Sequence, residues 1–414
     1  MTNGIVRLRW LLLGYAALIA IGTALLISSW AATSEALTLG QALFTAVSAV
    51  CLVGLTVVNT ATELSLGGQV IVMLLIQAGA VFYLFFAVLT ARQMNRWATG
   101  AQSEPGAPRD VFYRVLKIST LVEGGAFLLI YYTGGGSKIG ETGSGIFVAA
   151  FHAVSAFGNA GFSLLPENLH SVPRAFVLHL VILVAFGLGG LGIDMLYDLF
   201  SPRRLRQRLA NPSVDWRWGT RVSINASMVL LGCGALLFYV LEENNTLGEL
   251  NLTEKLIGSL FQSGTARTAG FYTVDITQLT TPTLMVMIGL MFVGGGAGST
   301  AGGIHIHTLY RAFAFEKQRQ PRLRTIAWWV IGYALVVNVL AMLVLRLAEP
   351  HREVVSLLFE QVSAFSSVGL RQANATTFSA GQNVILISML LGRVGILALT
   401  IKLIQTSRPA AEKM

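Results

Sequence analysis

The chain has 414 residues, of which 54% are hydrophobic and only 12% are charged. A soluble protein of this length would carry about 25% charged residues, so the composition excludes a soluble globular protein. The net charge of +9 would suit a nucleic-acid-binding protein. However, the basic residues gather in the connections between apolar segments, which is the pattern of a membrane protein.

Apolar runs about 20 residues long recur along the chain, and each is long enough to cross a bilayer core of about 30 Å. The third run is short, and the sixth is interrupted by glycines. We expect eight membrane-spanning segments, at about residues 10–31, 66–90, 118–132, 175–200, 222–241, 283–313, 326–345 and 384–404. An even number of spans places both termini on the same side of the membrane.

Basic side chains are distributed unevenly between the two sides of the membrane. Of the 29 Lys and Arg residues, 21 lie near the termini or in the connections that follow the second, fourth and sixth spans. The positive-inside rule therefore predicts that both termini and these three connections are cytoplasmic. We expect the lipid bilayer, and not nucleic acid, to be the surrounding partner.

The four connections on the opposite side contain similar motifs that end on a glycine. Gly54, Gly161, Gly270 and Gly369 are 107, 109 and 99 residues apart. The motifs read FTAVSAVCLVGL, FHAVSAFGNAGF, LFQSGTARTAGF and FEQVSAFSSVGL. A fourfold repeat at this spacing predicts four copies of one unit, each a span, a re-entrant motif and a span. The expected units are 1–95, 110–202, 216–315 and 324–406, followed by a cytoplasmic tail at 407–414.

The segment before each glycine is modestly apolar and about 11 to 13 residues long, which suits a helix that crosses half of the membrane. These segments lie at 37–49, 145–156, 254–264 and 353–364. Four helices whose negative C-terminal ends converge would favour a cation between them. Glycine lets backbones approach closely, and carbonyl oxygens there could replace the water around a cation. Any single glycine is better explained by helix packing, but four in register predict a pore.

These motifs, with GAGSTAGGI at 296–304 and GRVG at 392–395, resemble the Trk/Ktr/HKT superfamily of potassium transporters. The resemblance covers essentially the whole chain and is strongest to the membrane subunit of bacterial Ktr systems. It implies an all-α polytopic fold with four helix–pore loop–helix repeats around one central pore. It also implies potassium uptake across the cytoplasmic (inner) membrane, no enzymatic activity and no cofactor in this chain. Sodium as an activator stays open.

The resemblance further implies a selectivity filter with one glycine per repeat, at which potassium binds. In plant relatives a serine in place of the first glycine accompanies sodium permeation, whereas position 54 is a glycine here. One departure is Val53, because a threonine commonly precedes the first glycine. The filter residues are Val53, Gly54, Ala160, Gly161, Ala269, Gly270, Val368 and Gly369.

The sixth span contains GGGAGSTAGG at 294–303, and each interior glycine costs a helix about 1 kcal/mol relative to alanine. The segment is therefore either a closely packed kink or an unwound loop beneath the filter, and the resemblance implies that it gates the pore. The implied gate residues are Gly294, Gly295, Gly296, Gly298, Ser299, Thr300, Gly302, Gly303 and Arg393. His305 and His307 follow as an expected solvated pair, with pH-sensitive gating as the alternative.

Three further charges fall within predicted membrane segments. Arg393 lies in the middle of the eighth span, where a cation costs at least about 2.5 kcal/mol, so it needs a partner or a water-filled cavity. It either pairs with a carboxylate or, as the resemblance implies, faces the pore and opposes cation passage. We expect Arg267 to brace the third re-entrant loop through backbone carbonyls, and Glu123 to pair with Lys117.

Other functions remain as alternatives. One is a sodium-permeable or sodium-coupled transporter of the same superfamily. Another is an alternating-access carrier, although carriers of that kind use inverted repeats and these four share one orientation. An enzyme would need a convergent set of His, Asp, Glu or Cys, which the sequence lacks. The resemblance implies a homodimer on a cytoplasmic nucleotide-binding regulatory ring of the KtrA or TrkA kind.

Overall fold

The computed structural model describes residues 8–99, 107–135, 145–172, 174–211, 216–313, 321–372 and 379–406. Across these ranges the chain is helical and has no strand, only two isolated β-bridges, Ala32 to Leu64 and Val293 to Ile304. The prediction of an all-α membrane protein is therefore confirmed at this level.

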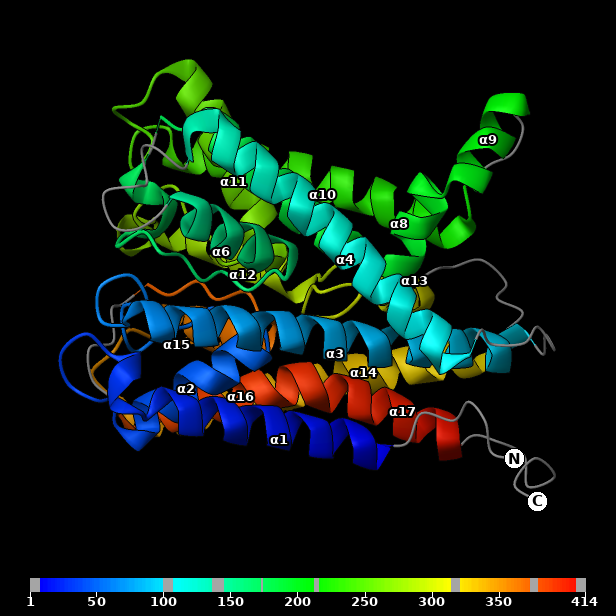
Figure 1. Ribbon diagram of the computed structural model, residues 1–414, viewed down its shortest axis with the longest axis horizontal. Helices are drawn as coiled ribbons and strands as arrows, with labels where there is room; N and C mark the ends of the chain where they lie inside the picture. Colours follow the sequence, from blue (N-terminus) through cyan, green and yellow to red (C-terminus); the bar gives the residue numbers. More distant parts are fainter. Residues whose placement is uncertain are drawn as a thin grey trace.

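A long helix, a short helix and a second long or broken helix follow one another four times along the chain (Figure 1). The first two groups are α1 (Leu8–Leu26), α2 (Leu39–Val50) and α3 (Leu66–Thr99), then α4 (Pro108–Ile130), α6 (Gly145–Phe157), α7 (Phe176–Leu191) and α8 (Ile193–Phe200). After the connecting α9 (Pro202–Ala210) come α10 (Trp218–Glu242), α11 (Leu252–Thr268), α12 (Thr281–Phe292) and α13 (Ile306–Phe313). The last group is α14 (Pro321–Ala348), α15 (Val354–Phe365), α16 (Ala380–Leu390) and α17 (Ile396–Thr406).

The long helices account for most of the expected spans. By length and composition, six helices of the described residues can cross a membrane, and the bent pair α7 and α8 makes a seventh if it counts as one span. The expected span at 283–313 consists of α12, a non-helical stretch and α13. The chain therefore has several spanning helices, and its division into eight spans stays a prediction.

The expected span at 175–200 is not a single straight helix. The chain bends by 109° between α7 and α8. The residue at the bend, Gly192, has φ +102, a backbone conformation that L side chains rarely adopt. The first span is also shorter than expected, because α1 ends at Leu26 and a 3₁₀ turn, Ser29–Ala31, follows it.

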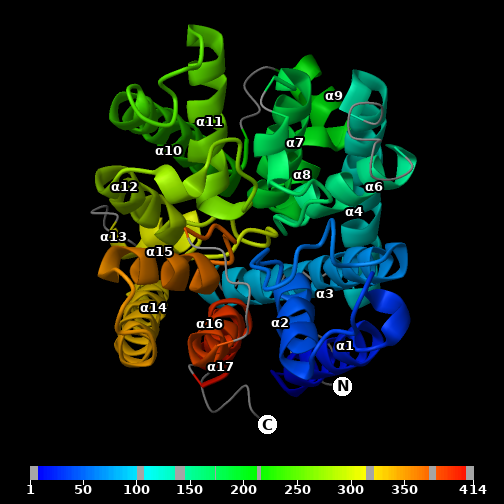
Figure 2. The ribbon, with the colours of Figure 1, turned by 90° about the vertical axis from the view of Figure 1, so that its left-hand side faces the viewer.

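The four groups of helices surround a common centre when the molecule is viewed from the end that holds the glycine motifs (Figure 2). Reciprocal capping boxes begin two of the short helices, α2 at Thr38 with Gln41 and α11 at Asn251 with Glu254. Because α11 continues to Thr268, it is longer than the predicted segment at 254–264. Large exposed apolar side chains cover the outer helices, as expected of a lipid-facing surface.

Candidate cation site and the segment beneath it

The four motif glycines meet at one place. Gly54, Gly161, Gly270 and Gly369 all have positive φ, at +88, +68, +74 and +91. A Cβ atom added to any of them would lie within 3.0 Å of a backbone carbonyl oxygen of the next turn. These four contacts form a closed ring, because each glycine faces the next turn and the last faces the first. The pairs are Gly54 with Ala160 O, Gly161 with Ala269 O, Gly270 with Val368 O and Gly369 with Val53 O. No side chain larger than hydrogen fits at these positions without displacing the backbone.

Local hydrogen bonds explain why three of the turns share one shape. The residue two positions before the glycine is left-handed in each of them: Leu52, Asn159 and Ser367. The next backbone N–H then donates to the carbonyl of a serine in the last turn of the short helix. These bonds are Val53 N to Ser48 O at 2.9 Å, Ala160 N to Ser155 O at 2.8 Å and Val368 N to Ser363 O at 2.8 Å.

The third turn is built differently. Its short helix α11 runs to Thr268, only two residues before Gly270, and Ala269 N donates to Thr265 O at 3.0 Å. The Thr265 hydroxyl donates to Phe271 O at 2.7 Å, as the Ser155 hydroxyl does to Phe162 O in the second turn. The negative C-terminal ends of the short helices therefore reach the turns in all four motifs. In the third motif, fewer residues separate the end of the helix from the glycine.

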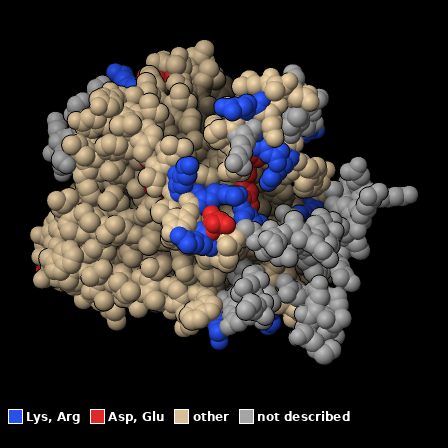
Figure 3. All heavy atoms as spheres, turned by 45° about the vertical axis from the view of Figure 1, so that its right-hand side comes forward, with Lys and Arg blue, Asp and Glu red and all other residues tan. Residues whose placement is uncertain are grey.

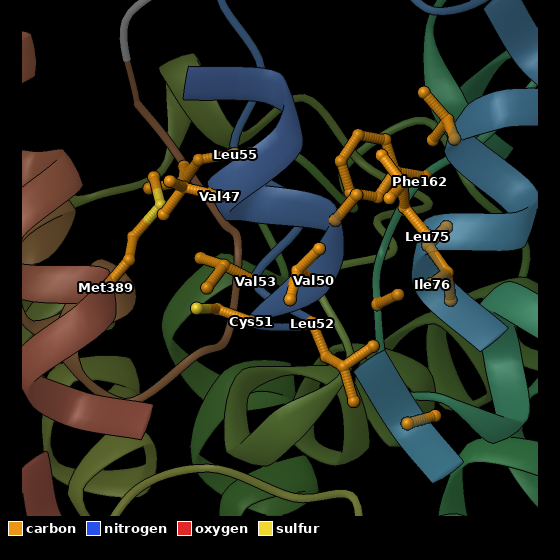
Figure 4. Packing of buried hydrophobic residues seen from close by; sticks show 14 of the residues in the cluster. Val47, Val50, Cys51, Leu52, Val53, Leu55, Leu75, Ile76, Phe162 and Met389 are labelled. Carbon is orange, nitrogen blue, oxygen red and sulfur yellow. The ribbon is translucent and has the colours of Figure 1, made fainter. Parts of the chain in front are cut away.

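Apolar side chains anchor the turns from the outside. In Figure 4, Val47 and Leu55 lie on the side of Met389, whereas Leu52 lies on the side of Ile76. All five of these side chains are buried in one hydrophobic cluster. The side chains thus pack outward, and the backbone of the turn is left at the centre.

A cavity of about 380 Å³ lies on the side of the turns away from the glycine-rich segment, and all four glycines line it. Glu63, Glu167 and Arg371 also line it. A cation approaching the glycines from this side would therefore pass two carboxylates and one guanidinium. Within the described ranges, no group of three or more His, Cys, Asp or Glu side chains could hold a metal ion, so the backbone oxygens are the candidate ligands.

Sequence reasoning missed an ion-pair network that ties the first and fourth turns together. Arg371, two residues after Gly369, binds the buried carboxylate of Glu360 through Nε at 2.7 Å and donates to Thr56 O at 3.2 Å. Arg352 binds the other oxygen of Glu360 at 2.8 Å. The available signal was a carboxylate in the apolar short helix α15, because such a charge is stable only when it is paired.

The glycine-rich segment lies directly beneath the turns and is not helical. It joins α12 to α13 and contains the fully buried Ser299 and Ala301. Asn159 Nδ2 of the second turn donates to Thr300 Oγ1 at 2.7 Å, and this hydroxyl donates to Phe157 O at 3.0 Å. Of the two interpretations of the sequence, an unwound segment is therefore the one observed.

The bend between α7 and α8 and the glycine-rich segment fit each other through backbone hydrogen bonds. Gly296 N donates to Gly190 O at 2.8 Å, and Thr300 N donates to Gly189 O at 3.1 Å. In return, Ile193 N donates to Gly298 O at 3.1 Å. The carbonyls and N–H group that the bend removes from the helix are thus satisfied by the segment.

Arg267 braces the glycine-rich segment and α10, and not the third re-entrant loop as expected. Its Nη2 donates to Gly294 O at 3.1 Å and to Ser227 Oγ at 3.3 Å. The expected carbonyl contact is therefore present, but it joins the third short helix to the beginning of the segment.

Arg393 is only 1% exposed and lies in a π-helical turn, Leu391–Gly395, between α16 and α17. Its guanidinium carbon lies 3.6 Å from the centroid of the Tyr83 ring, an arrangement that stabilises a buried cation. None of its three nitrogens has a hydrogen-bond partner among the described residues. The alternative of a carboxylate pair is not observed in these ranges.

Two expectations about polar residues are wrong. Glu123 accepts a hydrogen bond from Gln77 Nε2 at 3.0 Å and does not pair with Lys117 in the described structure. His307 is buried and not solvated. Its Nδ1 accepts from Ala297 N at 3.4 Å, and its Nε2 donates to Gly219 O at 3.1 Å.

Comparison with known proteins gives the family of this chain and a solved structure of the same fold. The cation transport protein family TrkH matches residues 111–411, which is well over half of the chain. This chain belongs to that family. A solved structure, the potassium transporter TrkH from Vibrio parahaemolyticus, has the same fold, with a TM-score of 0.75 over 97% of this chain and 86% of that one. The two sequences are only 17% identical, so this likeness concerns the fold alone.

The similar curated proteins include two with the same name. Ktr system potassium uptake protein B of Vibrio alginolyticus is 32% identical over 88% of this chain and 84% of that protein. The protein of that name in Bacillus subtilis (strain 168) is 31% identical over 96% of this chain and 93% of its own length. The potassium/sodium uptake protein NtpJ of Enterococcus hirae is 31% identical over 88% of this chain and 85% of that one.

Proposed function

We propose that the chain is the ion-conducting subunit of a potassium uptake system of the cytoplasmic membrane. One dehydrated K⁺ binds among the backbone oxygens of the four turns at Gly54, Gly161, Gly270 and Gly369. The observation that supports this most is the closed order of four positive-φ glycines, each facing a carbonyl of the next turn. Carbonyl oxygens can replace the hydration shell of K⁺, and four converging helix C-termini add negative potential. The names of the relatives point the same way.

The glycine-rich segment and Arg393 form the gate in this proposal. Ser299 and Ala301 are fully buried directly under the turns, so we infer that this arrangement blocks the path. Opening would break the buried hydrogen bond between Asn159 and Thr300, after which the small residues of the segment could move aside. Arg393 opposes cation passage by its charge, while Tyr83 stacks against it.

A second candidate is a transporter that also carries sodium or requires it. The Enterococcus hirae relative, named for potassium and sodium uptake, favours this candidate. The presence of Gly54 and of three equivalent glycines favours potassium, because a hydroxyl-bearing side chain is absent from all four positions.

The unit boundaries at 1–95, 110–202, 216–315 and 324–406 are part of the proposal, as is the placement of both termini and the tail at 407–414 in the cytoplasm. The subunit would act as a homodimer on a cytoplasmic nucleotide-binding ring. The printed word "system" in the names of the relatives supports a further component. Nucleotide effects would then be exerted through the ring and not by this chain.

The test is rubidium uptake by a potassium-transport-deficient bacterium that expresses the chain, with and without sodium. We expect saturable rubidium uptake driven by the membrane potential. A strict sodium requirement would favour the second candidate. Electrogenic current in proteoliposomes without a coupled ion would exclude an alternating-access carrier, whereas a fixed stoichiometry with a second ion would contradict the pore.

A further inference from the structure

A cavity of about 260 Å³ lies at the end of the molecule where α1 begins and α17 ends. It is bordered by α3, by α8, by the beginning of α10, by the glycine-rich segment and by α13. Arg217, Arg311, His307 and Ala297 are among its lining residues. The cavity therefore touches the segment that we propose as the gate and lies on the opposite side of it from the four glycines.

The surroundings of this cavity carry an excess of arginines. The lining carboxylate Asp194 is bound by Arg92 at 2.6 Å and by Arg114 at 3.5 Å. The neighbouring Asp198 lies within 4.0 Å of three arginines, including Arg217 at 3.9 Å. Figure 3 shows basic side chains gathered around acidic ones on this end of the molecule. Two carboxylates are thus shared among five arginines, and Arg311 also lines the cavity.

The backbone at the beginning of α10 adds to this preference for an anion. The first turn of α10, Trp218, Gly219 and Thr220, lines the cavity, and its N-cap residue Arg217 makes no side-chain capping bond. The N-terminus of this 25-residue helix carries positive potential, part of which the Asp198 carboxylate offsets by accepting from Arg217 N at 3.1 Å and from Thr220 Oγ1 at 3.0 Å. Trp218 packs on His307, with 5.9 Å between ring centroids, as aromatic residues do at membrane interfaces.

Hydrogen bonds of His307 join one wall of the cavity to the gate segment. The His307 ring bridges Ala297 N of the segment and Gly219 O of α10, and all three residues line the cavity. A ligand held against Arg217 and Arg311 would therefore restrain the two ends of this bridge. Basic pockets of this kind between spanning helices on the cytoplasmic side suit phosphate-bearing headgroups.

We propose that this cavity binds a phosphate group, either of an anionic membrane lipid or free in the cytoplasm, and holds the segment at 294–303 in its described position. The role of this segment as a gate rests on the proposed function, whereas the binding does not. Neither the arginine cavity nor its histidine bridge is needed for the cation site at the four glycines.

The test uses the full chain in detergent micelles and native mass spectrometry. We expect phosphatidylglycerol to bind more tightly than phosphatidylcholine, and the double variant Arg217→Gln, Arg311→Gln to weaken this binding about 25-fold, because each arginine contributes about fivefold. The control is Arg206→Gln, which removes the same charge from an exposed position of α9 outside the cavity. If the double variant does not fold, the half-exposed Arg217→Gln alone should weaken binding about fivefold.

A second arm titrates inorganic phosphate. Displacement of phosphatidylglycerol by millimolar phosphate would support the site and identify free phosphate as a ligand, and no displacement would support the lipid. In both cases hydrogen exchange at 294–303 should slow on binding in the native chain and not in the double variant. Equal lipid and phosphate binding in the double variant and in Arg206→Gln, or unchanged exchange in the segment, would overturn the proposal. Neither readout depends on ion flux.

Discussion

Among single residues, the four glycines at the centre cannot be replaced without displacing the backbone around them. Gly270 has φ +74, and a Cβ there would meet Val368 O. We expect Gly270→Ser to widen or distort the ring of oxygens and to lower the preference for rubidium over sodium by about tenfold or more. The measurement is inhibition of rubidium uptake by sodium.

The matched control for this change is Gly187→Ser. Gly187 lies in α7 with negative φ and with no atom within 4 Å of an added Cβ. The Gly187→Ser variant should transport rubidium with the native preference for rubidium over sodium. An unaltered preference in Gly270→Ser, or an equal loss in Gly187→Ser, would count against the four turns as the selective site.

Arg393 is the second residue whose role can be measured directly. Its guanidinium is buried against Tyr83 and has no hydrogen-bond partner among the described residues, so its charge is poorly compensated. A positive charge near the ion path raises the barrier for a cation. We therefore expect Arg393→Gln to raise the current at fixed membrane potential several-fold. A current equal to that of the native chain, with equal amounts of protein in the liposomes, would contradict the proposal that Arg393 opposes cation passage.

At the scale of elements, the bend between α7 and α8 depends on one glycine. Gly192 combines φ +102 with ψ 147, and its added Cβ would lie 2.7 Å from Ala297 O. A non-glycine residue in such a conformation costs about 1–3 kcal/mol. We expect Gly192→Ala to lower the free energy of unfolding by at least that much.

The control for the bend is Gly190→Ala, two residues earlier in the same helix, where an added Cβ meets nothing within 4 Å. Its backbone carbonyl still accepts from Gly296 N. Thermal unfolding in detergent compares the two. Equal melting temperatures would show that the bend does not depend on the conformation of Gly192.

The elements also show what sequence patterns can and cannot predict. The four motifs located the turns, because a glycine at a forced positive φ is a local requirement that recurs in each repeat. The bend at Gly192 was not predicted, since its backbone partners, such as Gly298, lie about 100 residues further along the chain. The pair of Arg371 with Glu360 was missed for a similar reason, because its second contact, Thr56, belongs to the first turn.

In the whole molecule, a pore through the four turns requires that the turns and the arginine-rich end face opposite sides of the membrane. A cysteine introduced at the exposed Glu249 should react with an impermeant maleimide in intact cells. A cysteine at the exposed Arg206 should react only after permeabilisation. Both variants should be built with Cys233→Ala, since Cys233 is exposed. Labelling of both positions from the same side would contradict the orientation.

The central claim is that one monovalent cation binds among the carbonyl oxygens of Val53, Ala160, Ala269 and Val368 and their glycines. The most direct measurement is anomalous scattering from crystals grown in rubidium. We expect the strongest rubidium peak at the centre of the four turns, and we expect it to be lost when sodium replaces rubidium. A centre without rubidium density, with the strongest peak elsewhere in the protein, would contradict the account.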